Sequence, residues 1–339
     1  MQQPLTPFRK ALFTGGALFL SLASCVVAGE LLTRLFWKQQ FTSVADERTL
    51  SYQYDSELGW RPIPNSAGRF TGSREISFQH NQDGFRDRSH GPKTKARIAF
   101  VGDSYVWGYD AEAEERFTDK LQLLIPDWEV MNLGISGYAT DQELLLARRW
   151  FDVYKPDLVV LVFSDNDTME NTLNLVHRGY YKPYFEPMGD RLALKGVPVP
   201  KCLQYYKVQH PWLGKSQLLQ MFVSQGLKRT APAHVSSANP TLPLIFQLKS
   251  YSEAKGAKFI LGYVDEFDGD KKRAFGEKAR LNYLFLLDTP HLTTEYFYPS
   301  QGNHWKPKGH DLACARLYAF LSTNQFLISG TNIVSSGKP

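Results

Sequence analysis

The sequence predicts an α/β fold in which a parallel sheet lies between two layers of helices, preceded by one membrane-spanning helix. Short apolar runs alternate with amphipathic segments along much of the chain, which is the order typical of βαβ units. One run, Leu158–Phe163 (LVVLVF), contains no polar residue, as expected for a strand that is buried on both faces. Near the N-terminus, residues 11–29 carry no charge. As a helix they would span about 28 Å, close to the thickness of the hydrocarbon core of a bilayer.

Composition sets broad limits on the function. The 339 residues suit one large domain or two modest ones, and the net charge is +5. Lys and Arg are spread along the chain, so no nucleic-acid partner is predicted, whereas an acidic polymer or a membrane surface is compatible with this charge. There are three cysteines, no CxxC motif and no His/Cys spacing typical of zinc, so we predict no metal site. We also predict no cofactor. We expect Cys202 and Cys314 to be unpaired.

Residues 1–34 are predicted to form a cytoplasmic tip and a transmembrane anchor. Arg9 and Lys10 precede the apolar stretch, so the N-terminus is expected in the cytoplasm and the remaining chain outside it. In a cell with two membranes, that location is the periplasm. Two alternatives stay open: a cleaved signal peptide, and a lipoprotein in which Cys25 of the segment Leu22–Cys25 is lipidated. The apolar character continues past Cys25, which favours the uncleaved anchor. The anchor and both alternatives would place the domain outside the cytoplasm.

Residues 35–96 are predicted to be an extended lead-in that packs on the domain. They are polar and rich in turn residues, and they include Leu58–Arg61 (LGWR) and Gly84–Asp87 (GFRD). Pro and Gly at this density indicate extended segments and turns. We expect a surface wrap without chemistry of its own, which can still form one rim of a cleft.

Residues 97–323 are predicted to form the α/β domain itself, and residues 324–339 a flexible tail. Residues 168–240 interrupt the alternation of strands and helices and are interpreted as an insertion or cap. Their many aromatic residues either stack on sugars or form a small satellite core. The predicted strands cover residues 97–101, 128–133, 158–163, 258–263 and 283–287, and the predicted helices cover about 114–124, 140–154, 243–254 and 308–321.

A candidate nucleophile follows the first predicted strand. Gly102 and Asp103 turn the chain sharply, and Ser104 comes where a helix can begin. A Ser on such a turn lies at the carboxyl edge of the sheet, where open α/β folds bind ligands. The unpaired N–H groups of the helix start can stabilise an oxyanion. The alternative is an ordinary N-cap serine.

Three segments together resemble the SGNH (GDSL-type) hydrolases. They are Gly102–Ser104 (GDS), Ser164–Asp167 (SDND) and Gly302–Trp305 (GNHW). The resemblance extends over residues 31–321 and is closest to membrane-anchored members associated with bacterial surface polysaccharides. It implies a flavodoxin-like parallel sheet. It also implies one of the activities of the family, which contains serine esterases, lipases and carbohydrate O-acetyltransferases.

The resemblance also implies roles for single residues. Ser104 takes the place of the nucleophile and His304 that of the base. The oxyanion hole would consist of the backbone N–H groups of Ser104 and Gly137 and the side-chain amide of Asn166. Glycine leaves room for an acyl group, and an amide donates a hydrogen bond without becoming charged. Ser164 stands where the family block begins with glycine.

The chain departs from the family in the residue that should orient the base. Relatives have an Asp two or three residues before the catalytic His, but here those positions hold Gly302 and Gln301. We therefore expect a Ser–His dyad or a non-standard triad, with Asn303, Gln301 or Asp288 as the possible orienter of His304. Loss of the acid can be costly when the wrong tautomer results.

The expected function is therefore that of a serine-dependent esterase or O-acyltransferase. It would act on acyl esters, most simply acetyl esters, of a carbohydrate outside the cytoplasm, with proteins of polysaccharide assembly as possible partners. The alternative is a weak or inactive protein of the same fold that binds polysaccharide or serves in its assembly. A nucleotide-binding domain is disfavoured, because the sequence has neither GxGxxG nor GxxxxGK[ST].

Overall fold

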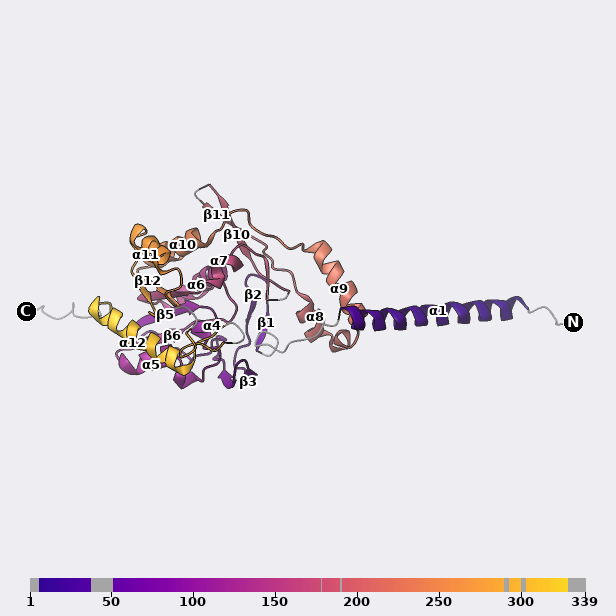
Figure 1. Ribbon diagram of the computed structural model, residues 1–339, viewed down its shortest axis with the longest axis horizontal. Helices are drawn as coiled ribbons and strands as arrows, with labels where there is room; N and C mark the ends of the chain where they lie inside the picture. The colour runs from indigo at the N-terminus through magenta and orange to yellow at the C-terminus, as the bar shows by residue number, and fades with distance from the viewer. Residues whose placement is uncertain are drawn as a thin grey trace, which may run out of the picture. The chain divides into compact units, whose positions relative to one another are not determined.

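The computed structural model describes residues 6–37, 51–177, 179–189, 191–289, 293–299 and 303–328 (Figure 1). The chain divides into two units: unit 1 contains residues 1–45 and 202–232, and unit 2 contains residues 46–201 and 233–339. Residues 202–232, which the sequence analysis placed in the insertion, therefore group with the N-terminal helix. Of the expected flexible tail, residues 329–339 lie outside the described residues.

Unit 2 is built on a five-stranded parallel sheet, as predicted. The strand order is β13-β12-β7-β5-β6, and every neighbouring pair is parallel. All six side chains of β7 are buried, which explains its wholly apolar sequence. The strands are β5 (Ala96–Gly102), β6 (Trp128–Asn132), β7 (Leu158–Phe163), β12 (Lys258–Tyr263) and β13 (Tyr283–Phe285).

Helices cover both faces of this sheet, which confirms the three-layer architecture. On one face, alternate strand residues such as Ile98 and Phe100 share a core with Phe117 and Leu317. These last two residues belong to α5 and α12. On the other face, α6 contacts β5, and α10 contacts both β12 and α6. The four helices are α5 (Phe117–Leu124), α6 (Thr140–Tyr154), α10 (Thr241–Ala254) and α12 (Pro307–Thr323).

Local sequence signals account for most element boundaries. The bounds of α6, β7 and β12 are those predicted from apolar runs and helix caps. Helix α6 ends at Tyr154, and its C-cap residue, Lys155, takes a left-handed conformation ahead of Pro156. The helix predicted from residue 114 begins as the short 3-10 turn η1 (Ala113–Glu115), and α5 starts only at Phe117. After β12, a further helix, α11 (Gly269–Lys278), precedes β13.

The lead-in of unit 2 forms two antiparallel hairpins. Strands β1 (Tyr52–Asp55) and β2 (Gly59–Pro62) pair with each other, as do β3 (Ala67–Thr71) and β4 (Glu75–Gln79). Trp60 on β2 is fully buried. The lead-in therefore contributes to the core as well as wrapping the surface.

The part of the insertion that belongs to unit 2 contains several buried aromatic side chains. Tyr180, Tyr181 and Phe185 are buried, so these three rings are not exposed for stacking on a sugar. The elements of this part are α7 (Asn166–Glu170), β8 (Leu175–Val176), β9 (Tyr180–Tyr181), β10 (Tyr184–Met188) and β11 (Arg191–Lys195).

Unit 1 consists of helices. They are α1 (Pro7–Phe36), α8 (Leu203–Gln209), the 3-10 turn η2 (Pro211–Lys215) and α9 (Gln217–Thr230). Helix α1 is long and apolar enough to cross a membrane, a property that signal sequences share. Cys25 on α1 is exposed, whereas Cys202 and Cys314 are both buried.

Candidate active site

Ser104 lies on a sharp turn between β5 and a short helix, α4 (Ser104–Trp107). The N-cap of this helix is Asp103, whose carboxylate accepts a hydrogen bond of 2.9 Å from the backbone N–H of Tyr105. Ser104 is therefore the first helical residue, and the N-cap alternative for this serine is wrong. Its hydroxyl is left available for another partner.

That partner is the imidazole of His304. The Nε2 atom of His304 lies 2.8 Å from the Oγ atom of Ser104, although the two residues are 200 positions apart in the chain. Both residues are buried, with 8% of their surface exposed. A nucleophile and a base at this distance can exchange a proton directly.

Neighbouring residues hold the imidazole in place. Trp305, the next residue, is buried in the core of unit 2. The carbonyl of His304 accepts a hydrogen bond of 2.9 Å from the N–H of Tyr298, and a β-bridge joins Phe297 to Trp305. The backbone is thus held at His304 and at the residue that follows it.

The three residues proposed to orient His304 differ in the contacts that they make. Asn303 has a φ of 55°, and its backbone carbonyl accepts a hydrogen bond of 3.0 Å from the hydroxyl of Tyr105. Asp288 forms an ion pair with Arg316. Gln301 lies outside the described residues. The orienter of His304 therefore stays a prediction.

His310, the other histidine of this segment, lies away from Ser104 in the contact that it makes. It is buried, and its Nδ1 atom accepts a long hydrogen bond of 3.4 Å from the N–H of Phe117. Burial and nearby cations lower the pKa of His310 to about 3. It is therefore neutral at ordinary pH and acts as an acceptor.

The loop that contains Gly137 packs closely against α4. A Cβ atom on Gly134 would lie 2.4 Å from the backbone nitrogen of Trp107, so only glycine allows this approach. Gly137 has a φ of 78°, a conformation that glycine adopts without strain. Its carbonyl accepts a hydrogen bond of 2.8 Å from Nε2 of His177. The structure thus brings the Gly137 loop against the helix that carries Ser104.

Two residues of the lead-in, neither of them predicted to have such a role, hold this loop. The indole N–H of Trp60 donates to the carbonyl of Ser136 at 3.3 Å, and the hydroxyl of Tyr52 accepts from the N–H of Ser136 at 3.3 Å. The hydroxyl of Tyr138 donates in turn to the carbonyl of Trp60. The signal available in the sequence was a tryptophan in an otherwise polar, turn-rich segment.

Asn166 follows β7 and opens α7. Its side chain is exposed, and its Oδ1 atom accepts a hydrogen bond from the hydroxyl of Ser164. Both side chains also interact with the carboxyl of Asp103. Burial raises the pKa of Asp103 to about 7, while hydrogen bonds from Tyr105, Asn166 and Ser164 oppose that rise. Asp103 thereby connects the segment of Ser104 to the segment of Asn166.

Further acidic groups lie buried near Asp103. Burial raises the pKa of Glu143, and the charges of Asp103 and Asp141 raise it further. Asp141 is paired with the buried ammonium of Lys182. Asp167 accepts a hydrogen bond of 2.8 Å from Thr140, and burial together with Glu143 raises its pKa. Burial therefore favours the neutral form of the carboxyl groups of Glu143 and Asp167.

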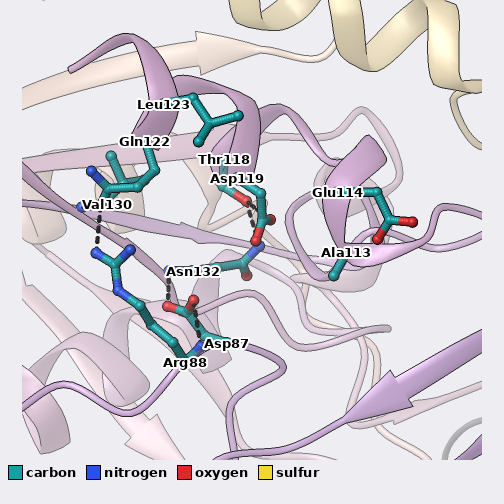
Figure 2. A pocket seen from close by; sticks show the side chains of 10 residues that line it. All are labelled: Asp87, Arg88, Ala113, Glu114, Thr118, Asp119, Gln122, Leu123, Val130 and Asn132. Carbon is teal, nitrogen blue, oxygen red and sulfur yellow. Dashed lines mark hydrogen bonds between the residues drawn. The ribbon is translucent and has the colours of Figure 1, made fainter. Parts of the chain in front are cut away.

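A separate pocket of about 390 Å³ opens beside α5 and β6 (Figure 2). Its polar groups bond to one another: the N–H of Asn132 donates to Asp87 at 2.8 Å, and Arg88 donates to Gln122. None of the predicted site residues lines it. Among the described residues, no group of three His, Cys, Asp or Glu side chains is arranged to hold a metal ion.

Comparison with known proteins finds no matching family model and no matching curated relative. Solved structures of the G-D-S-L family are similar to this chain. A member of that lipolytic family from Veillonella parvula shares 11% identity over 67% of this chain and 98% of its own, with a TM-score of 0.40. The psychrotrophic esterase EstA from a Pseudoalteromonas species shares 12% identity over 68% of this chain and 100% of its own, with a TM-score of 0.38.

A two-domain esterase active on acetylated mannans is also similar. It shares 14% identity over 72% of this chain and 53% of its own, with a TM-score of 0.36. Likeness at these values assigns no activity, so the function proposed below depends on the geometry around Ser104.

Proposed function

We propose that this protein is a serine-dependent esterase or O-acyltransferase. The observation that carries the proposal is the 2.8 Å separation between Nε2 of His304 and Oγ of Ser104 at the carboxyl edge of the parallel sheet. This edge is where open α/β sheets bind their ligands. A serine and a histidine in this arrangement are the central pair of acyl-transfer enzymes.

In the proposed reaction, the hydroxyl of Ser104 attacks the carbonyl carbon of an ester while His304 takes its proton at Nε2. The tetrahedral intermediate collapses, the C–O bond of the leaving group breaks, and His304 returns the proton to the departing alcohol. The acyl group then remains on Ser104 as an ester. Water or a second alcohol, deprotonated by His304, attacks this ester and restores the serine.

The negative charge that develops on the carbonyl oxygen requires hydrogen-bond donors. We assign this role to the backbone N–H groups of Ser104 and Gly137 and to the amide of Asn166. The contact between the Gly137 loop and α4 supports this assignment, as does the link from Asn166 to Asp103. Donors that are already in place stabilise the transition state without reorganisation.

The proposed substrate is an acyl ester, most simply an acetyl ester, of a carbohydrate outside the cytoplasm. The resemblance of the sequence motifs to polysaccharide-associated members of the family supports this substrate class. The apolar helix α1 and the basic residues at its start support a single-pass anchor in the cytoplasmic membrane with the N-terminus inside. Proteins of polysaccharide assembly are the proposed partners.

A fluorophosphonate probe tests the nucleophile directly. The full-length protein in detergent is expected to be labelled, and labelling is expected to disappear in the Ser104→Ala variant. Acetyl release from acetylated glycans should fall at least ~100-fold in Ser104→Ala and in His304→Ala, because each substitution removes a complete chemical role.

Equal rates in the wild type and both variants would refute the catalytic proposal. An unlabelled wild-type protein that still binds polysaccharide would instead support the alternative, a protein of the same fold with a binding or assembly role. This alternative is tested because Asp288, the only carboxylate among the possible orienters of His304, is paired with Arg316.

A further inference from the structure

We propose that residues 202–230, which form α8, η2 and α9, lie on the surface of the membrane that α1 crosses and contact anionic lipid headgroups there. This inference rests on the proposed anchoring role of α1. It adds a second point of membrane contact, built from a segment more than 160 residues further along the chain.

The first observation is that the end of α1 is bonded to the start of α9. The carboxylate of Glu30 accepts hydrogen bonds from the backbone N–H groups of Gln217 at 3.0 Å and Leu218 at 2.9 Å, and from the hydroxyl of Ser216 at 2.8 Å. Arg34, paired with Glu30 at 2.7 Å, donates to the carbonyl of Lys215 at 2.7 Å. Glu30 therefore neutralises the unpaired N–H groups and the positive dipole end of α9.

This bond sets the depth of α9 relative to the bilayer. Glu30 is the first charged residue after the uncharged stretch of residues 11–29. A carboxylate at this position marks the boundary between hydrocarbon and headgroups, because a charge within the hydrocarbon is costly. The start of α9 and the preceding turn η2 must therefore lie at the level of the membrane interface.

The second observation is the set of side chains that this segment exposes. Leu213 and Tyr205 are buried. In contrast, Val208, Trp212 and Phe222 are 62%, 59% and 62% exposed. Tryptophan is the side chain most typical of membrane interfaces, because its ring is apolar and its N–H is polar.

The third observation is charge. Residues 202–230 contain no Asp or Glu, whereas Lys207, Lys215, Lys228 and Arg229 are all basic. A helical segment with apolar and basic side chains lies in the plane of the interface and is attracted to anionic lipid. An acidic protein partner could pair with these basic side chains. It would not explain why the segment is hydrogen-bonded to the end of α1.

The test uses the full-length protein reconstituted into phosphatidylcholine vesicles that also contain phosphatidylglycerol. A fluorescent amino acid is encoded at position 208 or 222, and quenching by brominated lipid is measured. Matched controls carry the same amino acid at position 20, within α1, and at position 153, an exposed valine of unit 2. We expect quenching and a blue shift at positions 20, 208 and 222 and none at position 153.

Quenching at position 20 without quenching at 208 and 222 would overturn this inference and leave the anchor intact. No quenching at position 20 would refute the anchor and this inference with it. Equal quenching at position 153 would also overturn it, because lipid contact would then not be particular to the segment. We further expect quenching at position 222 to fall when phosphatidylglycerol is omitted, or when Lys228 and Arg229 are both changed to Glu.

Discussion

The imidazole of His304 lies face to face with the phenol ring of Tyr109, with ring centroids 4.0 Å apart and planes inclined by 22°. Tyr109 comes just after α4, beyond Gly108, whose φ of 85° ends the helix. One short segment therefore supplies both the hydroxyl of Ser104 and the surface against which its partner base lies.

The stacking predicts that Tyr109 is a positioning residue. Tyr109→Ala should lower kcat by about 10- to 100-fold, because the imidazole would lose the surface that directs Nε2 toward Ser104. Tyr109→Phe keeps the ring and should retain most activity. Ester hydrolysis at several pH values, with a thermal melt of each variant, separates lost positioning from lost folding. Wild-type kcat in Tyr109→Ala would contradict this role.

The proposed oxyanion hole predicts a specific kinetic effect at Asn166. Asn166→Ala should lower kcat by about 100- to 1,000-fold with little change in KM, because the amide acts on charge that exists only in the transition state. Thr168→Ala, an exposed position on the same helix, is the matched control and should be neutral. A change confined to KM would remove Asn166 from the oxyanion hole.

Substitution of one buried arginine of the lead-in, Arg86, is expected to lower the stability of the protein strongly. The guanidinium of Arg86 donates hydrogen bonds to the carbonyls of Ser77, Trp107, Gly108 and Ala111 at 2.7 to 3.2 Å. Arg86→Lys leaves several of these buried carbonyls unpaired, so we expect the free energy of unfolding to fall by about 3 kcal/mol. Urea denaturation measures this change.

The control for this prediction is Arg69→Lys. Arg69 pairs with Glu75 at 2.8 Å, but its side chain is 75% exposed. A surface ion pair contributes less than about 1 kcal/mol, so this variant should unfold almost like the wild type. Equal stability losses in both variants would mean that the buried hydrogen bonds of Arg86 are not the cause.

Because Glu143 is a buried acid, we expect it to make the free energy of unfolding fall as the pH rises. Glu143 is fully buried, neither of its oxygens has a hydrogen-bond partner among the described residues, and burial raises its pKa well above 4.5. Below that ordinary value the carboxyl is protonated in both states. Above it, the unfolded chain releases the proton while the native protein retains it, so the free energy of unfolding decreases.

Glu143→Gln removes this group's pH dependence. We expect the free energy of unfolding of this variant to be close to that of the wild type near pH 5. Near pH 8 it should be higher by more than about 1 kcal/mol, since each unit of pKa difference corresponds to about 1.4 kcal/mol. Urea denaturation at both pH values measures it. Glu114→Gln, at an exposed position of η1, should change stability equally little at both. A variant less stable than the wild type near pH 8 would show that Glu143 is ionised in a favourable site.

Local signals in the sequence were sufficient to predict where the strands of the sheet and their neighbouring helices lie in the chain. The apolar run of β7 and the polar start of α6 predicted their bounds, because burial on both faces and helix capping depend on residues near each other in the chain. The same signals predicted the α/β/α layers. They could not show that the helix after β5 is capped by Asp103 rather than Ser104, since both residue types are good caps.

The resemblance of the sequence motifs to the SGNH hydrolases was enough to nominate Ser104, Gly137, Asn166 and His304 as a site. Only the tertiary structure decided what surrounds them. The stacking of Tyr109 on His304, the hold of Trp60 on the Gly137 loop and the bond from Glu30 to α9 join residues far apart in sequence. No local pattern encodes such contacts, because they depend on how separate elements pack.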